Sequence, residues 1–289
     1  MTIIVTALFP KHVLQVSDRK LSWARGKAIV QQEDRWNKAI VFGDWATIAY
    51  TGPARLPDQR TDQWITETIS RTTMVDQAIN ELWEKANDRL QQKQWNPPEL
   101  AIVVAGWMQD AGKVEPFRAA ISNYLLPEGK HGPARDQFNV LMSRQQEAGL
   151  GIYIAGRNMP RRNFMMMGRT LKRAYRRGVS MPTMAEVIVN AARGLHDRWI
   201  GESFNAVIVP EPVPGRPFRG MIGASQGGPQ PDLPLALYFP GPNAGPEYVM
   251  PNFGGGGMAV TDISVIPRAL TAEEVAERYR AGPPMPRRI

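Results

Sequence analysis

Cysteine is absent from the 289-residue chain, and histidine occurs only three times. The absence of cysteine excludes disulfide bonds, thiolate metal sites and a cysteine nucleophile. His12, His131 and His196 lie far apart in the sequence, and none has a spacing typical of metal ligands, such as H-E-x-x-H. We therefore expect no metal ion and no cofactor, and each histidine is expected to be solvated or packed in the ordinary way.

Long hydrophobic runs are missing as well. No stretch of about eighteen apolar residues occurs, so we expect no membrane-spanning helix and no membrane partner. Pro10, Lys11 and His12 interrupt the first apolar run, which does not fit the pattern of a signal segment. The sequence thus predicts a cytoplasmic protein. Its 43% apolar and 21% charged residues are typical of a globular fold, and the net charge of +8 permits an acidic partner without requiring one.

The first half of the chain shows strand and helix patterns in a regular order. Short apolar runs predict strands at 3–8, 13–16, 38–42, 46–50, 100–107 and 116–122. The polar break between the first two runs favours a hairpin. Between residues 62 and 90, apolar residues recur at helical spacing and predict two helices. Residues 24–38 are polar and fit a loop or a short edge hairpin.

The second half begins with a polar segment, 125–148, that has no clear pattern. Strands are predicted at 152–156 and 204–209, with a basic region over 157–177 and a helix over 184–196 between them. Residues 211–289 hold 14 of the 25 prolines. We therefore predict a domain over residues 1–210 and a Pro/Gly-rich C-terminal extension of unknown role over residues 211–289, with a final helix that starts at Thr271.

The segment from Thr2 to Asp18 carries the first candidates for chemistry. An initiator methionine before a small residue is normally removed, which would leave Thr2 with a free α-amine. Its hydroxyl is a nucleophile, and an α-amine with a pKa of about 7.7–8.0 can accept a proton near neutral pH. The predicted hairpin would return Asp18 to the neighbourhood of Thr2. Taken alone, this stretch is explained better by an ordinary N-terminal strand followed by a turn.

Two later residues complete a set. Lys38 opens a predicted strand, and Gly52 ends the next one fourteen positions on. Alone, they fit a solvated lysine and a turn glycine. In their order and spacing, however, these residues and the predicted elements resemble the proteasome-type β subunits of the N-terminal-nucleophile (Ntn) hydrolases, as a divergent bacterial type. That family begins with a threonine, has an aspartate sixteen residues later, as Thr2 and Asp18 do, and has the same lysine-to-glycine spacing.

A further match lies between the last predicted helix of the domain and its last strand. The family has an Asp-x-x-Ser-Gly segment there, and this chain has residues 197–201, which begin with Asp197. Two positions depart from the family. Ile200 stands where the segment has serine, and Gly156-Arg157-Asn158 stands where the family has a Gly-Ser-Gly turn. In the family, both serines form hydrogen bonds around the threonine amine. Arg157 or Asn158 would have to substitute for those hydrogen bonds here. The resemblance covers residues 2–210.

The resemblance implies an α+β fold, a four-layer αββα sandwich with two antiparallel sheets between layers of helices. It implies a threonine-type peptidase or amidase acting on a peptide or amide substrate, and self-association into a ring or stacked assembly, with no ATPase partner specified. Thr2 would be the nucleophile and its amine the base, while Lys38 would stabilise the alkoxide and Asp18 would position Lys38. The Gly52 N–H would stabilise the oxyanion, and Asp197 would complete the site.

Two alternatives stay open. The replaced serines at positions 157 and 200 are compatible with an assembly subunit that kept the fold and lost activity. The basic region over 157–177, which includes Phe164 and Tyr175, would suit nucleic-acid binding, although a solvated helix face or a subunit interface explains it as well.

Two glycine-rich motifs lead to no function. Residues 223–227 match the G-x-S-x-G pattern of a nucleophile elbow, but prolines follow and no histidine lies beyond His196. The glycine run over 254–257 lacks the Gly-Lys-Ser/Thr of a phosphate-binding loop. We interpret the first as a loop and expect no nucleotide at the second.

Overall fold

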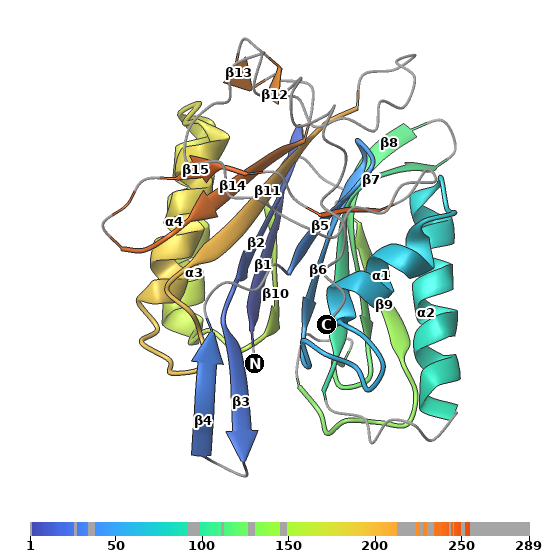
Figure 1. Cartoon of the computed structure of the whole chain (residues 1–289). Coiled ribbons are helices and arrows are strands. Elements are labelled where there is room, and N and C mark those ends of the chain that lie inside the picture. The colour runs from blue at the N-terminus through green and yellow to red at the C-terminus, as the bar shows by residue number, and fades with distance from the viewer. Residues whose placement is uncertain are drawn as a thin grey trace.

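A computed structural model describes residues 2–25, 28–33, 38–91, 99–110, 113–126, 131–144, 149–212, 224–225, 228–229, 234–242, 244, 246–249 and 252–254. Within these ranges the protein is of the α+β class, with two six-stranded sheets and four helices (Figure 1). Two small hairpins lie outside the large sheets: β3 (Leu21–Arg25) with β4 (Ala28–Glu33), and β12 (Ala224–Ser225) with β13 (Gly228–Pro229).

The first sheet has the strand order β10-β1-β2-β11-β14-β15, and all its neighbouring strands are antiparallel. Its strands are β1 (Ile3–Leu8), β2 (His12–Asp18), β10 (Gly151–Gly156), β11 (Phe204–Pro210), β14 (Leu235–Phe239) and β15 (Glu247–Tyr248). The predicted β1–β2 hairpin is confirmed. It pairs Ile4 with Ser17, which brings Asp18 to the start of β1.

The second sheet has the order β16-β5-β6-β7-β8-β9 and is antiparallel except for the β16–β5 pair. Its strands are β5 (Ala39–Phe42), β6 (Ala46–Thr51), β7 (Ala101–Asp110), β8 (Lys113–Ser122), β9 (Asn139–Arg144) and β16 (Asn252–Gly254). Every residue of β5 and β6 is buried. Strands buried on both faces consist of continuous apolar runs, which explains why the sequence pattern marked them clearly.

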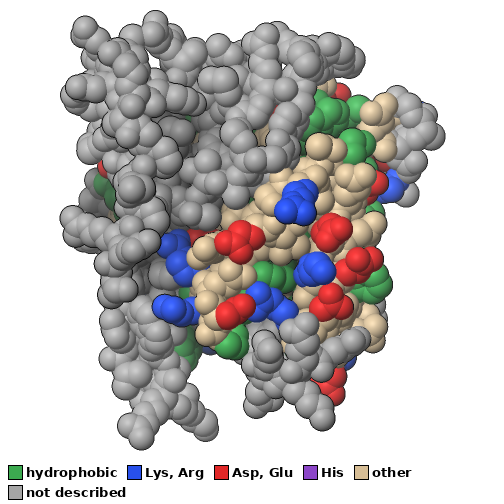
Figure 2. Space-filling view, turned by 45° about the vertical axis from the view of Figure 1, so that its right-hand side comes forward, with side chains coloured by type: hydrophobic (Ala, Val, Ile, Leu, Met, Phe, Trp, Pro, Cys, Tyr) green, Lys and Arg blue, Asp and Glu red, His purple; other side chains and the backbone are tan. Residues whose placement is uncertain are grey.

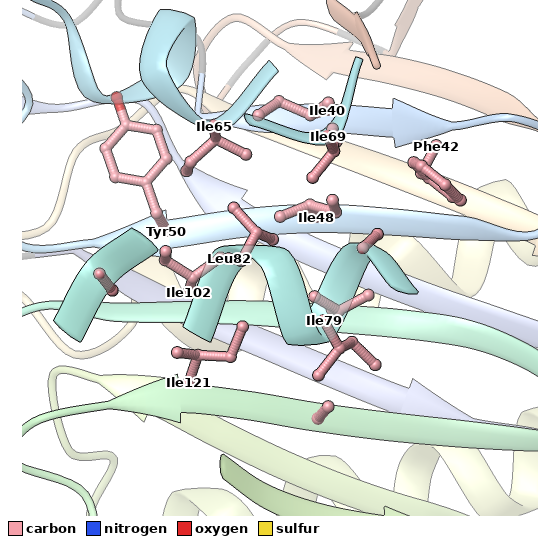
Figure 3. Close-up of a cluster of buried hydrophobic side chains, with 14 of the residues drawn as sticks. Ile40, Phe42, Ile48, Tyr50, Ile65, Ile69, Ile79, Leu82, Ile102 and Ile121 are labelled. Carbon is pink, nitrogen blue, oxygen red and sulfur yellow. The ribbon is translucent and has the colours of Figure 1, made fainter. Parts of the chain in front are cut away.

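Each sheet has a helix pair on its outer face (Figure 1). Helices α1 (Thr61–Ile69) and α2 (Val75–Gln91) pack on the second sheet, where their aliphatic side chains meet those of β5 to β8 (Figure 3). Helices α3 (Arg161–Arg176) and α4 (Met181–Arg193) pack on the first sheet. The N-cap of α4 is Ser180, whose side chain accepts the Thr183 N–H, so the helix begins three residues earlier than the apolar spacing predicts.

The inner faces of the two sheets pack against each other. Val41 and Trp107 of the second sheet lie in one apolar cluster with Val13 and Val207 of the first. A polar contact crosses the same interface, because Gln15 Nε2 of β2 donates to the Val103 carbonyl at 3.2 Å. The Thr47 hydroxyl of β6 donates to Gln15 Oε1 at 3.2 Å. A buried amide that is fully hydrogen-bonded fixes the register of the two sheets more strictly than apolar packing does.

The structure resolves two regions that the sequence left open. Segment 125–148, which showed no clear pattern, contains the edge strand β9. Its side chains are mostly half-buried, so they lack the strict alternation that marks a strand. The polar residues 24–38 include β4, which pairs with β3 as a short hairpin, one of the two expected forms.

The boundary at residue 210 stays a prediction. Described strands beyond it extend both sheets, with β14 beside β11 and β16 parallel to β5. The helix expected from Thr271 and most of the glycine run at 254–257 lie outside the described residues.

Acidic and basic side chains are interspersed over the described surface seen in Figure 2, with only small apolar areas between them. Among the described helices, none has the length and apolar character needed to cross a bilayer.

Candidate active site

Thr2 lies between the two sheets, before the first residue of β1 and next to the last residue of β6. It precedes β1 directly and is 1% exposed. Its backbone N–H donates to the Thr51 hydroxyl at 3.3 Å, and its carbonyl accepts the Arg157 N–H at 2.9 Å. The candidate nucleophile is therefore held by backbone contacts to strands of both sheets, which restricts the orientation of its hydroxyl.

Lys38 meets Thr2 from the other sheet, immediately before β5. Its Nζ donates to the Thr2 hydroxyl and to the Lys20 carbonyl, the latter at 2.5 Å. Nζ also lies 3.8 Å from Oδ1 of Asp18, and both side chains are almost fully buried. A cation held this close in a low-dielectric site stabilises negative charge that develops on the threonine oxygen. The expectation of a solvated lysine is wrong for this position.

Asp18 connects three segments through its carboxylate. Oδ1 accepts the Ile3 N–H and Oδ2 accepts the Gly201 N–H, each at 3.1 Å. Complete burial raises the pKa of the Asp18 carboxyl, and the nearby Lys38 ammonium is the strongest influence in the opposite direction. The carboxylate thus orients Lys38 while its own position is fixed by the backbone on both sides.

Two glycines next to the site have positive φ angles. Gly52 follows Thr51 at the end of β6 and has φ +127°, and a Cβ there would overlap the Glu99 carbonyl oxygen. Gly156 has φ +81°, and a Cβ there would overlap the Thr2 carbonyl oxygen and lie 2.8 Å from Thr51 Oγ1. Both positions require glycine, because any other side chain would displace backbone at the site. The role of Gly52 as oxyanion donor stays a prediction.

Asp197 forms an ion pair with Arg157, whose Nε lies 2.5 Å from Oδ2. Oδ1 accepts the Trp199 N–H at 2.9 Å. Partial burial would raise the pKa of Asp197, but these hydrogen bonds outweigh it and lower the pKa. The two residues join the predicted site in one chain of contacts, since the Arg157 backbone bonds Thr2 and its side chain bonds Asp197.

Ile200 does not offer a polar group to the site. Its side chain is buried in the apolar cluster between the first sheet and helices α3 and α4. The backbone of the segment is nonetheless turned toward the site, because the adjacent Gly201 N–H donates to Asp18. Residues 197–201 therefore contribute a backbone N–H to the site, whereas the resembling family has a serine hydroxyl there as well.

A pocket of about 320 Å³ includes in its wall Gly156 and Arg157, which contact the Thr2 backbone. Its lining residues are charged, polar or glycine: Glu99, His131, Gly156, Arg157, Asn158 and Asp197. Burial lowers the pKa of His131, with the Glu99 charge acting in the opposite direction. Among the described residues, no group of three or more His, Cys, Asp or Glu side chains could hold a metal ion.

Comparison with known proteins adds no assignment. No family model matches the chain, and no curated protein matches its sequence. The case for the site therefore depends on its geometry.

Thr2, Asp18 and Lys38 converge as the resemblance implies. Gly52 follows Thr51, which bonds Thr2, and Asp197 is linked to Thr2 through Arg157. The sequence did not reveal Thr51 and Tyr124, whose hydroxyls lie behind Thr2, nor Glu99 and His131 in the pocket. Thr51 could have been suspected as the neighbour of Gly52. Nothing marked the other three, because their segments have no periodicity that fixes where they lie.

Proposed function

We propose that the protein is a threonine-type peptidase or amidase of the Ntn-hydrolase class, with the four-layer αββα sandwich of proteasome-type β subunits. The carrying observation is the contact of Lys38 Nζ with the Thr2 hydroxyl, backed by Asp18. This arrangement places a buried cation on the oxygen that would become nucleophilic. Support for the fold comes from two sheets packed face to face, with a helix pair outside each.

The mechanism requires that Met1 is removed, because only then does Thr2 have a free amine. The Thr2 hydroxyl oxygen attacks the substrate carbonyl carbon while its proton passes to the α-amine. Lys38 stabilises the developing alkoxide, and the Gly52 N–H stabilises the oxyanion. Collapse of the tetrahedral intermediate breaks the C–N bond, and the ammonium protonates the leaving amine. Water then attacks the acyl ester on Thr2 and gives a proton to the amine. Collapse of the second intermediate breaks the ester C–O bond, the ammonium returns its proton to the Thr2 oxygen, and the acid leaves.

Mass spectrometry of the purified full chain tests this proposal first. We expect an intact mass that lacks Met1, and a single covalent adduct at Thr2 after treatment with an epoxyketone, because that reagent uses both the hydroxyl and the free amine. The control is Thr6→Ala, which removes the hydroxyl of a buried threonine within β1 and should label normally, whereas Thr2→Ala should not label. Retention of Met1, or labelling that persists in Thr2→Ala, would refute the mechanism.

A second candidate is a proteasome-like subunit that assembles but does not hydrolyse. It is favoured by the apolar burial of Ile200 and by the use of Arg157 in an ion pair with Asp197, which leaves no serine hydroxyl at either position. The same labelling experiment separates the two. A folded chain that forms a ring or stack and lacks Met1, but gives no adduct at Thr2, would favour the assembly subunit.

The basic helix α3 supports a third candidate, a nucleic-acid-binding protein. Its exposed positions include Arg161, Arg162, Arg169, Lys172, Arg173 and Arg176, and the helix contains no acidic residue. This candidate predicts retention on DNA or RNA that falls steeply with salt. Reversing three of these charges, in R169E/R173E/R176E, should lower the salt slope by about three, while reversal of exposed Lys85 on α2 should not. Absence of retention at 50 mM salt, about the low end of such assays, would eliminate it.

A further inference from the structure

The Thr51 hydroxyl is a buried polar group that forms hydrogen bonds with the backbone of Thr2, the candidate nucleophile. Thr51 is the last residue of β6 and is 1% exposed. Its oxygen accepts the Thr2 N–H at 3.3 Å, and its proton is donated to the Thr2 carbonyl, also at 3.3 Å. After removal of Met1, the same oxygen would lie next to the free α-amine.

Tyr124 lies behind Thr51 and is also buried. Its hydroxyl is hydrogen-bonded to the Thr51 side chain and to the backbone of Gly156. The Thr51 hydroxyl therefore has three polar neighbours: the Thr2 N–H, the Thr2 carbonyl and the Tyr124 hydroxyl. Burial raises the pKa of Tyr124, so the phenol keeps its proton over the pH range in which an α-amine titrates.

The backbone of Gly156 packs closely against the contacts between Thr2, Thr51 and Tyr124. Gly156 touches both ends of it, since a Cβ there would overlap the Thr2 carbonyl oxygen and lie 2.8 Å from Thr51 Oγ1. The Tyr124 ring also packs edge-on against His131, with ring centroids 5.2 Å apart, and His131 lines the pocket. Gly156 therefore restricts the movement of Thr2 and Thr51, and His131 restricts that of the Tyr124 ring.

We propose that Thr51 and Tyr124 are positioning residues for the Thr2 α-amine, and that their hydroxyls replace the serine hydroxyls that the chain lacks at positions 157 and 200. This inference rests on the proposed hydrolase function, because it concerns the base of that reaction. Thr51 touches the amine directly, and Tyr124 acts through its contact with the Thr51 hydroxyl.

The contacts that link Tyr124, Thr51 and the Thr2 amine, which we call the relay, affect the protonation of the amine. The Thr51 oxygen accepts from the amine, and such a bond is stronger when the amine is protonated. Replacement of Thr51 by valine removes this acceptor and lowers the pKa of the amine by about one pH unit. Replacement of Tyr124 by phenylalanine changes the same pKa through Thr51 alone, so it should have no effect once Thr51 is valine.

The experiment measures the pH dependence of Thr2 amine modification by an amine-reactive reagent, read from the mass of the N-terminal peptide of the full chain. We compare Thr51→Val, Tyr124→Phe, their double variant and Thr51→Ser. The matched control is Thr66→Val, a buried threonine of α1 whose hydroxyl bonds carbonyls of its own helix. We expect a shift of about one pH unit in Thr51→Val, near-normal behaviour in Thr51→Ser and Thr66→Val, and a double variant equal to Thr51→Val.

In Thr51→Val the acidic limb of the kcat/KM pH profile should move to lower pH by the same amount, while the plateau value falls about tenfold because Thr51 no longer orients the amine. An unshifted amine titration in Thr51→Val would overturn the relay, whether or not the chain hydrolyses amides. Additive effects in the double variant would overturn the role of Tyr124 through Thr51. A shifted titration without any turnover would keep the relay and refute the hydrolase. Retention of Met1 would overturn both.

Discussion

Replacement of Lys38 by methionine is expected to abolish hydrolysis, with a loss of at least about a thousandfold in kcat/KM. Methionine preserves most of the volume of the buried side chain, so the packing around β5 is retained. It removes the ammonium that donates to the Thr2 hydroxyl and lies 3.8 Å from Asp18. The alkoxide would then form in a buried site without a counter-charge. Steady-state kinetics on fluorogenic peptide amides measures this loss.

The same variant should show a stability loss that grows with pH. Burial raises the pKa of Asp18 above its usual 3.8, and Lys38 is the main influence that lowers it, so its removal raises that pKa further. Between the unfolded and folded pKa values, the folded chain keeps a proton that the unfolded chain has released. Each rise in pH therefore destabilises the fold, up to about 3–5 kcal/mol once an unpaired carboxylate is buried.

Thermal and urea unfolding at pH 4 to about 8 checks this sign. The control is Lys113→Met, which removes an exposed lysine at the start of β8 and should change neither activity nor the pH profile of stability. A Lys38→Met protein that retains hydrolysis would contradict the role of the cation. A stability deficit that is constant over the pH range would contradict the raised pKa of Asp18.

Replacement of Gly156 by alanine should cost about 3 kcal/mol of unfolding free energy and remove activity. The residue has φ +81°, which is unfavourable for alanine, and the added Cβ would overlap the Thr2 carbonyl oxygen. Relief of this overlap must move either β10 or the nucleophile. Both movements weaken the contact of Arg157 N–H with Thr2 and the hydrogen bonds through Thr51.

Gly178→Ala provides a matched control for that variant. Gly178 also has a positive φ angle, +68°, but no atom lies within 4 Å of the Cβ that alanine would add. Its cost should therefore be limited to backbone strain, about 1 kcal/mol. The difference between the two variants in chemical unfolding isolates the overlap at Thr2. Equal costs for the two variants would show that the contact between Gly156 and Thr2 carries no energy.

The sequence predicted the interior strands well, because a strand covered on both faces is largely apolar, as in β5 and residues 101–107 of β7. It could not predict β9, whose half-buried residues leave no pattern. Within the site, Thr2, Asp18 and Lys38 were recoverable because their spacing matches that of the resembling family. Tyr124 was not, because its approach to Thr51 depends on how β8 ends relative to β6, and no local pattern records that arrangement.

Arg157 illustrates a different limit. The resemblance to the proteasome-type subunits marked it as the replacement of a serine, and the ion pair with Asp197 follows only from the folded backbone. His131 is a packed side chain, as expected, but its place in the pocket wall was not predicted. Three isolated histidines offer no spacing to interpret, so only the fold reveals which one lines the pocket.

The division of the site between the two sheets has a mechanical consequence. Thr2 and Asp18 belong to one sheet, while Lys38 and Thr51 belong to the other, and the Gln15 amide bridges the two. A small slide of one sheet over the other would change the distance from Nζ to the threonine oxygen and leave both sheets intact. The packing between the two sheets therefore sets the alignment of Lys38 with Thr2. Substitutions in that packing can change this alignment even when they lie far from Thr2.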